Sequence, residues 1–401
     1  MSDSTLPIRS SSAKKNIFPA LVVFLLILPP PGMLLGLAGA LLLLFFALRG
    51  SLPGATRPRT LNLVMLVLTF FYAVGFALGP HNELAVSSAG EFVAGSILFY
   101  LILSTANQTK SFADFLGLLL LVGIGLSFLA PLTVVEDISK SFAFPFMPAF
   151  APRLGKTINS NVMSGALVAL LPLALGALVQ RISARTRFIA ALAFFPMGLV
   201  LFFLQSRSAW LAFLVACAVM LVLWNKWFLP VVLVVGAGFF ALAPQLNLPS
   251  FDAAAGPFRI VGRIGQREEI WALGAQLIRE HPVTGIGAGA FEAYSAAQVK
   301  QVEPGVYETP VPHAHNWILQ IALDAGIPGL LAFAALVALS ARSLWRARLS
   351  ETLRPIFIGM TGAWAAMLVQ GLTDATMIDT RASLIFWWIL GSSLVWDYGH
   401  H

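Results

Sequence analysis

The chain has 401 residues, of which 58% are hydrophobic and only 11% are charged, and its formal net charge is +7. Soluble domains carry about 25% charged residues, so this chain has too few charges to cover a surface exposed to water. The composition therefore excludes most soluble folds, together with the disordered, collagen-like and disulfide-rich classes. Apolar runs recur at about 20 residues, the length that a helix needs to cross a bilayer, so the sequence predicts an all-α polytopic membrane protein.

Twelve apolar runs predict about twelve transmembrane helices. The first run follows Lys14 and Lys15 and ends in three prolines without a small-residue cleavage site, so we interpret it as a span and not as a cleavable signal peptide. The single cysteine, Cys217, lies inside an apolar run and is interpreted as a small buried hydrophobe. The predicted spans cover residues 16–30, 33–48, 61–79, 89–105, 112–132, 160–180, 187–205, 208–224, 227–245, 328–345, 355–373 and 382–397.

The placement of Lys and Arg predicts the orientation of the spans. If the N-terminus lies inside the cell, every inner loop carries a cation, whereas the two short outer loops near residues 29–32 and 81–83 carry none. This asymmetry is typical of cytoplasmic loops, so we expect both termini in the cytoplasm. The cations that remain on the outer side are Lys140, Arg153, Lys156, Arg207, Arg259, Arg263, Arg267, Arg279, Lys300 and Arg381. Ordinary loop charge explains any single one of them, and an outward-facing anion site is the alternative.

The segment 246–327 is the long interruption of the apolar pattern, and it divides the chain into spans one to nine (1–245), an outer loop, and spans ten to twelve with a cytoplasmic C-terminus (328–401). Within it, the spacing of apolar residues over 267–280 predicts an amphipathic helix that lies against the membrane or the bundle. A flexible Gly-rich turn over 285–289 and a second helix over about 289–300 are expected to follow. The turn lacks the strand and the spacing of a dinucleotide-binding fingerprint, so we expect no nucleotide cofactor.

Two histidines, His313 and His315, lie one residue apart just before Trp317. A metal site would need further ligands, and the sequence shows no second cluster of His, Cys or paired carboxylates near them, so no metal is predicted. One alternative is that both are polar residues at the water–membrane boundary, with Trp317 as an interfacial anchor.

A longer motif begins at the second histidine. His315-Asn316 is followed by nine residues and then by Gly326-Ile-Pro-Gly329. This pattern resembles that of the O-antigen ligase and O-antigen polymerase superfamily of bacterial membrane glycosyltransferases. The resemblance covers roughly residues 150–397, and the first five predicted spans match in hydropathy alone.

Three further stretches match the superfamily in order. Ser206-Arg207-Ser208-Ala209 resembles its Ser-Arg turn between two spans. Arg267 with Trp271, followed by the Pro/Gly-rich turn 282–287, resembles its Arg-x-x-x-Trp helix. The stretch 153–161, which contains Arg153, Lys156 and Asn161, resembles its Gly…Asn-x-Asn start of a span.

The resemblance implies a GT-C-type helical bundle in the bacterial inner membrane with an active site that faces the periplasm. The implied donor is a glycan on undecaprenyl pyrophosphate. The ligase transfers it to the lipid A-core, and the polymerase transfers it to another carrier-linked glycan. The implied reaction uses no nucleotide sugar, cofactor or metal, and we expect a lipid bilayer but no nucleic acid as a partner. The oligomeric state stays open.

The chemistry assigns roles to these residues. Arginine grips phosphate oxygens with two parallel hydrogen bonds, so Arg207 and Arg267 are the candidates that hold the leaving pyrophosphate. Histidine is the usual base near neutral pH, and we prefer His315 to His313 chiefly on the family match. Asp374 is a candidate to orient His315 or an arginine, with an ordinary helix-end aspartate as the alternative. The remaining substrate-binding candidates are Arg153, Lys156, Asn161, Arg263, Asn316 and Arg381, whereas Arg259 and Arg279 are interpreted as surface charges.

Two alternatives concern the activity: ligase or polymerase, and enzyme or transporter. A compact chain with one long outer loop favours the ligase over the polymerase, although the stretch 133–159 is a modest second loop. A secondary transporter is the competing class. Transporters often have inverted repeats and broken or charged helices at mid-membrane. Here no repeat is evident, and the charges cluster at the ends of the spans.

Overall fold

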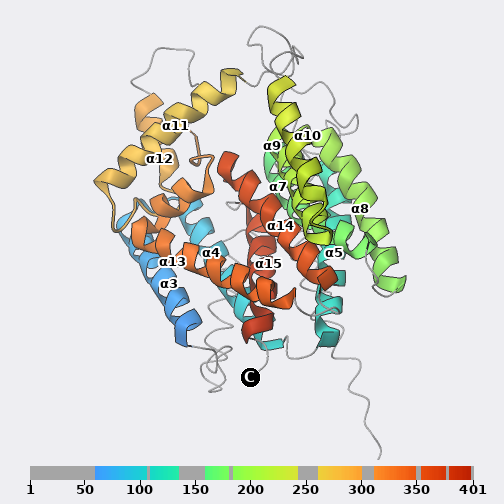
Figure 1. Ribbon diagram of the computed structural model, residues 1–401. Helices are drawn as coiled ribbons and strands as arrows, with labels where there is room; N and C mark the ends of the chain where they lie inside the picture. The colour runs from blue at the N-terminus through green and yellow to red at the C-terminus, as the bar shows by residue number, and fades with distance from the viewer. Residues whose placement is uncertain are drawn as a thin grey trace, which may run out of the picture.

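The computed structural model describes residues 59–105, 109–134, 159–179, 184–242, 261–299, 311–348, 354–375 and 379–398, and the statements below concern these residues. Helices make up nearly all of this part of the chain, and it contains no strand (Figure 1). Eight of its helices are long and apolar enough to cross a membrane, and two shorter apolar helices accompany them. The prediction of an all-α polytopic membrane protein is therefore confirmed.

The helices follow the predicted spans closely. Spans three to twelve each correspond to one helix or to part of one, while the first two predicted spans, 16–30 and 33–48, lie outside the described residues. The amphipathic helix of the outer segment begins six residues earlier than predicted. The bounds are α3 Arg59–Leu78, α4 Glu83–Thr105, α5 Thr109–Thr133, α7 Ser160–Val179, α8 Ala184–Leu204, α9 Arg207–Trp224, α10 Phe228–Leu242, α11 Val261–Glu280, α12 Phe291–Val299, α13 Trp317–Ala347, α14 Arg354–Thr373 and α15 Thr380–Tyr398.

The bundle is built around α7, α13, α14 and α15. Helix α14 packs on α7 and α9, α13 packs on α3, and α15 packs on α4. Close approach of α7 and α14 depends on small residues, because a Cβ atom on Gly176 would lie 2.9 Å from the Cα of Gly359. On the outside of the bundle, large apolar side chains such as Phe128 and Phe195 are about 70% exposed, at 69% and 71%, as a surface in contact with lipid requires.

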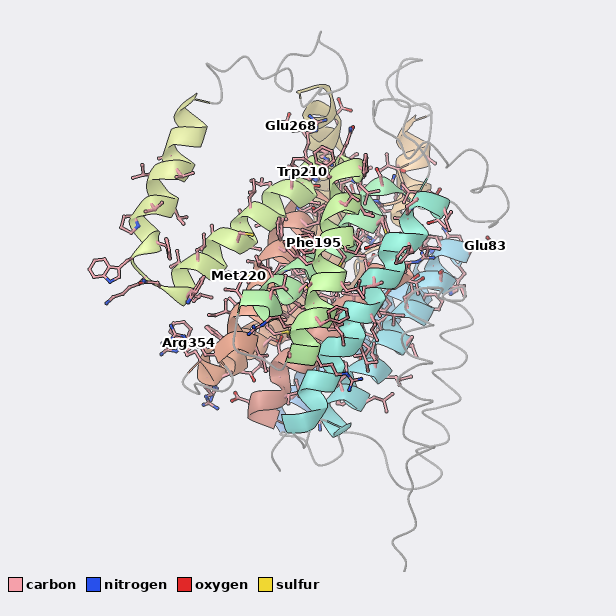
Figure 2. The ribbon with its side chains drawn as sticks, turned by 90° about the vertical axis from the view of Figure 1, so that its right-hand side faces the viewer. Glu83, Phe195, Trp210, Met220, Glu268 and Arg354 are labelled. Atoms are coloured by element: carbon pink, nitrogen blue, oxygen red, sulfur yellow. The ribbon has the colours of Figure 1, made fainter. Side chains whose placement is uncertain are left out.

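The direction of the helices brings several helix ends to the same side of the bundle. The guanidinium of Arg354, at the start of α14, donates to the carbonyl of Trp224, at the end of α9. Because the two helices run antiparallel, the start of α9 lies beside the end of α14. Figure 2 shows the same arrangement, with Trp210 and Glu268 toward one end of the molecule and Arg354 toward the other.

A kink divides α13 into a short first part and a long second part. Gly326 has φ 69° and ψ 178° inside the helix, which a residue with a side chain rarely adopts. The break leaves carbonyl groups without their usual helical donors. The predicted flexible turn supplies donors instead, since the backbone N–H groups of Ile286 and Gly287 both donate to the carbonyl of Leu323. The turn over 285–289 is therefore held in place against α13.

Candidate active site

The two histidines lie in a short non-helical segment that leads into α13. The Nδ1 atom of His313 accepts a hydrogen bond from the backbone N–H of His315 at 3.2 Å, and the ring centroids lie 4.1 Å apart. His315 has a positive φ of 48°, a left-handed conformation that is uncommon for a residue with a side chain. Such backbone conformations gather at functional sites, where the surroundings hold them in place.

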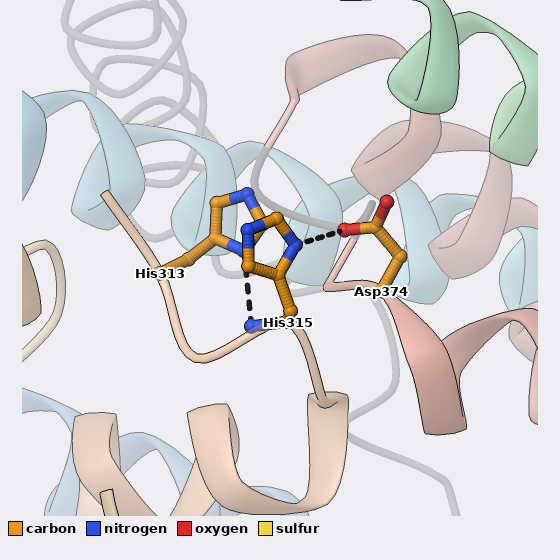
Figure 3. A group of neighbouring side chains, drawn as sticks. All are labelled: His313, His315 and Asp374. Atoms are coloured by element: carbon orange, nitrogen blue, oxygen red, sulfur yellow. Dashed lines mark hydrogen bonds and ion pairs between the residues drawn. The ribbon is translucent and has the colours of Figure 1, made fainter. Parts of the chain in front are cut away.

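The imidazole of His315 is held by a carboxylate from a distant part of the chain. Its Nδ1 atom lies 3.1 Å from Oδ1 of Asp374, which directly follows α14 (Figure 3). The same carboxylate oxygen accepts the backbone N–H of Ala375 at 2.9 Å. Asp374 is only 2% exposed, whereas the side chain of His315 is 25% exposed. The buried member of the pair is thus the carboxylate, and the imidazole remains accessible.

The electrostatics of the pair favour an ionised carboxylate. Burial alone would raise the pKa of Asp374, but the hydrogen bond from His315, together with the charges of His315, His313 and Arg267, lowers it below its ordinary value. The pKa of the neighbouring histidine is lowered as well, and for an imidazole this favours the neutral form. Burial, with smaller contributions from His315 and Arg267, lowers the pKa of His313 to about 4. His313 is therefore neutral near pH 7.

Asn316 has a structural role in this arrangement. Its side-chain oxygen accepts the backbone N–H groups of Ile318 and Leu319 and so caps the start of α13. Its amide nitrogen donates to the carbonyl of Leu372 near the end of α14 at 3.1 Å. One side chain thus fixes the distance between the segments that carry His315 and Asp374.

Gln320 also supports the histidine segment, although it is not among the site residues predicted from the sequence. Its oxygen accepts the backbone N–H of Ala314, which lies between the two histidines, at 3.0 Å. Its amide nitrogen donates to Asp324 at 2.8 Å. A glutamine four residues before an aspartate on an otherwise apolar helix is the signal in the sequence that would have indicated this pair.

Arg267 lies close to the histidine–carboxylate group. It is half-buried in α11, and its charge acts on both His313 and Asp374. Helix α11 packs on α13, and its Gly274 faces Leu319, Leu323 and Ala314. Arg263 is on the same helix, one turn before Arg267, and its side chain is outside the described residues.

Arg207 is the first residue of α9 and is exposed. Since α9 starts at the end of the bundle where α14 terminates, Arg207 and Asp374 share one end of the molecule. The turn before Arg207 has a feature in common with the histidine segment, because Gln205 also has a positive φ, of 51°. Both turns that carry predicted catalytic residues therefore contain a left-handed residue.

Of the other predicted residues, two are described by the structure and two are not. Asn161 is half-buried in the first turn of α7, and Gly165, one turn further on, lines a small cavity together with Asp374. Arg381 is the second residue of α15 and makes an ion pair with Asp379 at 3.3 Å. These two residues thus lie at the same end of the bundle as His315. Arg153 and Lys156 lie outside the described residues.

Asp374 adds a possible third metal ligand to the two histidines. The ring nitrogens of His313 and His315 and a carboxylate oxygen of Asp374 all lie within 4.8 Å of one another, so a carboxylate does accompany the histidines. The expectation that the ligand set is too small was wrong, because Asp374 is 59 residues away in sequence. Two ring nitrogens of this group are already used within it, since Nδ1 of His313 accepts a backbone N–H and Nδ1 of His315 bonds to Asp374.

The interpretation of Trp317 as an interfacial anchor was also wrong. The side chain is buried in the apolar core and is only 4% exposed. Its ring packs edge-on against Phe333 at 5.3 Å and Phe386 at 5.9 Å. Trp317 therefore fixes the start of α13 from the inside of the bundle.

The arrangement suits proton abstraction from a hydroxyl group. When the Nδ1–H group of His315 donates a hydrogen bond to the ionised carboxylate of Asp374, the Nε2 atom carries a free lone pair. This lone pair can take up a proton. The charge of Arg267 nearby favours an anion. The imidazole, the carboxylate and the arginine thus come from the segment before α13, the residue after α14 and α11.

Comparison with known families gives a match to this part of the chain. Residues 192–334 match the family model described as O-antigen ligase. The matched region begins within α8 and ends within α13, so it includes Arg207, Arg267 and both histidines. A comparison with curated proteins gave no match.

Proposed function

We propose, from the match of residues 192–334 to the O-antigen ligase family model, that this chain transfers an O-antigen glycan en bloc from undecaprenyl pyrophosphate to a sugar hydroxyl of the lipid A-core. The family match does not separate ligase from polymerase. The ligase is the preferred activity because the sequence has one long outer segment, 246–327, and a compact chain.

The observation that carries the proposal is the pair formed by His315 and Asp374 beside Arg267. In the proposed step, the Nε2 atom of His315 takes the proton from the acceptor hydroxyl. The hydroxyl oxygen forms a bond to the anomeric carbon of the donor glycan. The bond from that carbon to the pyrophosphate breaks, and its electron pair leaves with the undecaprenyl pyrophosphate.

The arginines act on the leaving group. A pyrophosphate is a good leaving group when its growing negative charge is stabilised, and a guanidinium beside it acts mainly in the transition state. Arg267 and Arg207 take this role in the proposal, with Arg153, Lys156, Arg263 and Arg381 as additional contacts to the donor. The chemistry requires no metal or cofactor, because the glycosyl donor is already activated.

The proposed setting is the bacterial inner membrane. Eight described helices can cross a membrane, and the charge asymmetry of the predicted loops favours cytoplasmic termini. In that orientation the end of the bundle that carries His315 faces the periplasm, where the lipid A-core acceptor and the flipped donor are both available.

An assay in vitro tests the proposal. Purified protein is given a defined undecaprenyl-pyrophosphate glycan, with lipid A-core and a second carrier-linked glycan offered as alternative acceptors. We expect the glycan on lipid A-core. A lengthened carrier-linked glycan would instead assign the polymerase activity. Absence of both products, with uptake of a radiolabelled solute that survives His315→Ala, would favour a transporter.

A further inference from the structure

A largely apolar cavity with several polar groups lies inside the bundle next to the candidate active site. It has a volume of about 100 Å³ and lies between α3, α4, α13 and α15. Trp317 and Ala375, which directly follow Asn316 and Asp374, both line it, so it adjoins the segments that hold the catalytic pair. Its polar lining consists of Tyr72, Ser88, Glu91, Gln320, Asp324 and Ser383.

Ser88 indicates that the cavity binds a hydrogen-bonding group. The serine is only 9% exposed, it lines the cavity, and its hydroxyl has no hydrogen-bond partner within the described part of the chain. Leaving a buried hydroxyl without a partner is unfavourable, so such groups in native proteins call for an explanation. A ligand that hydrogen-bonds to Ser88 provides one.

The two carboxylates of the cavity define the charge of that ligand. Glu91 accepts a hydrogen bond from Thr380 at 2.7 Å, and Asp324 accepts one from Gln320 at 2.8 Å, so both are held in fixed positions. The oxygens of both side chains accept hydrogen bonds from hydroxyl groups, and the described lining contains no Lys or Arg that would hold a phosphate. The leaving pyrophosphate therefore belongs on the side of Arg267, and an uncharged hydroxyl-bearing group belongs in the cavity.

The size and the walls of the cavity indicate which kind of ligand fits into it. A cavity holds one water when about 10–15 Å³ is open to it, so a volume of about 100 Å³ leaves room for several hydroxyl groups. Much of the remaining wall consists of aromatic rings, among them Phe92, Trp317 and Trp387. This combination fits one edge of a sugar, with its hydroxyl groups toward the carboxylates and its apolar face on the rings.

We propose that this cavity is a subsite for the hydroxyl groups of an uncharged sugar, namely the sugar unit that reacts at His315. The inference rests on the proposed function and adds to it a binding site and a preference for uncharged sugars. The sugar comes from either the donor glycan or the acceptor. Gln320 connects the subsite to the base, since it bonds to Asp324 on one side and to the backbone of Ala314 on the other.

The first test compares two serines on the same helix. Ser88→Ala removes the hydroxyl from the cavity, and Ser96→Ala removes a second hydroxyl of α4 that is also buried without a partner among the described residues but does not line the cavity. We expect Ser88→Ala to raise the KM of one substrate about tenfold, the factor that corresponds to ~1.4 kcal/mol, with kcat nearly unchanged. Ser96→Ala should leave both KM values unchanged.

The substrate whose KM rises identifies the source of the sugar. A higher KM for the undecaprenyl-linked donor assigns the subsite to the donor glycan, and a higher KM for lipid A-core assigns it to the acceptor. Unchanged KM values for both substrates in Ser88→Ala would overturn the proposal. So would a change of equal size in Ser96→Ala.

A binding experiment keeps this inference separate from the proposed reaction. The melting temperature of the purified full chain is measured with methyl glucoside and, separately, with glucose 6-phosphate. We expect the uncharged glycoside to raise the melting temperature of the wild type more than that of Ser88→Ala, and the phosphorylated sugar to have little effect. An equal rise in wild type and Ser88→Ala would contradict the subsite even if glycan transfer is observed. A wild type that transfers no glycan but shows the difference would retain the subsite and reject the proposed function.

Discussion

The imidazole of His315 and the carboxylate of Asp374 lie 3.1 Å apart, although 59 residues separate them in the sequence. The pair joins the segment before α13 to the end of α14. Since Asp374 holds Nδ1, the opposite ring nitrogen, Nε2, is the atom that can act on a substrate. Most of the chemistry proposed for this protein depends on that geometry.

The first prediction concerns the base. His315→Ala should reduce glycan transfer by about 10²–10⁴-fold, because a positioned general base contributes a factor of that size. Transfer is measured with the defined donor and lipid A-core. His281→Ala, an exposed histidine at the end of α11, is the control and should retain wild-type activity. Wild-type turnover in a well-inserted His315→Ala protein would remove His315 from the mechanism.

The second prediction concerns the orienting carboxylate. Asp374→Asn should lower kcat by about 10²-fold or more with little change in KM, because an amide does not hold the Nδ1–H tautomer as a carboxylate does. Asp397→Asn is the matched control. Asp397 lies near the C-terminal end of α15, where it pairs with Arg346. If Asp374→Asn raises only the KM, Asp374 contacts the substrate and does not orient the base.

The third prediction concerns the two arginines. Arg267→Lys and Arg207→Lys should each lower kcat, by up to about 10²-fold, because lysine keeps the charge but loses the two parallel hydrogen bonds to phosphate. Arg279→Lys provides a control on α11, where Arg279 is exposed. Full activity in both lysine variants would show that a point charge is sufficient.

The fourth prediction concerns metal. His313, His315 and Asp374 form a group that can hold an ion, yet the proposed reaction uses the same imidazole as a base. Activity should therefore survive treatment with EDTA. The measurement is transfer before and after chelation, followed by addition of Mg²⁺ or Zn²⁺. Loss of activity that either ion restores would contradict the metal-free mechanism.

The fifth prediction concerns pH. The pKa of His313 falls from an ordinary 6.5 to about 4 in the folded protein, chiefly through burial. Between these values the unfolded chain binds a proton that the folded chain does not, so stability decreases as the pH falls below about 6.5. We expect the melting temperature to fall between pH 7 and pH 5 by an amount that reflects on the order of 1 kcal/mol. His313→Gln should reduce this dependence, and an unchanged profile would show that His313 is not the group responsible.

The sequence by itself determined the class of the fold and the positions of its helices. An apolar run of about 20 residues in a bilayer has to form a helix, because the backbone finds no water to bond to there. This local rule accounts for the agreement between predicted spans three to twelve and the observed helices. The resemblance to a known family indicated His315, and together with the placement of cations at the ends of the spans it indicated Arg207 and Arg267.

The sequence offered Asp374 as a partner of either His315 or an arginine, and the packing of the helices determines that it contacts His315. The contact between His315 and Asp374, the hydrogen bond from Asn316 to Leu372, and the cavity of Ser88, Glu91 and Asp324 all join segments more than 50 residues apart in the sequence. The packing of α13, α14, α4 and α15 sets these distances, and hydropathy does not encode which helices are neighbours. The low charge content that indicated a membrane protein also made each buried polar group informative, because such a group is expensive in an apolar bundle unless it is paired or used.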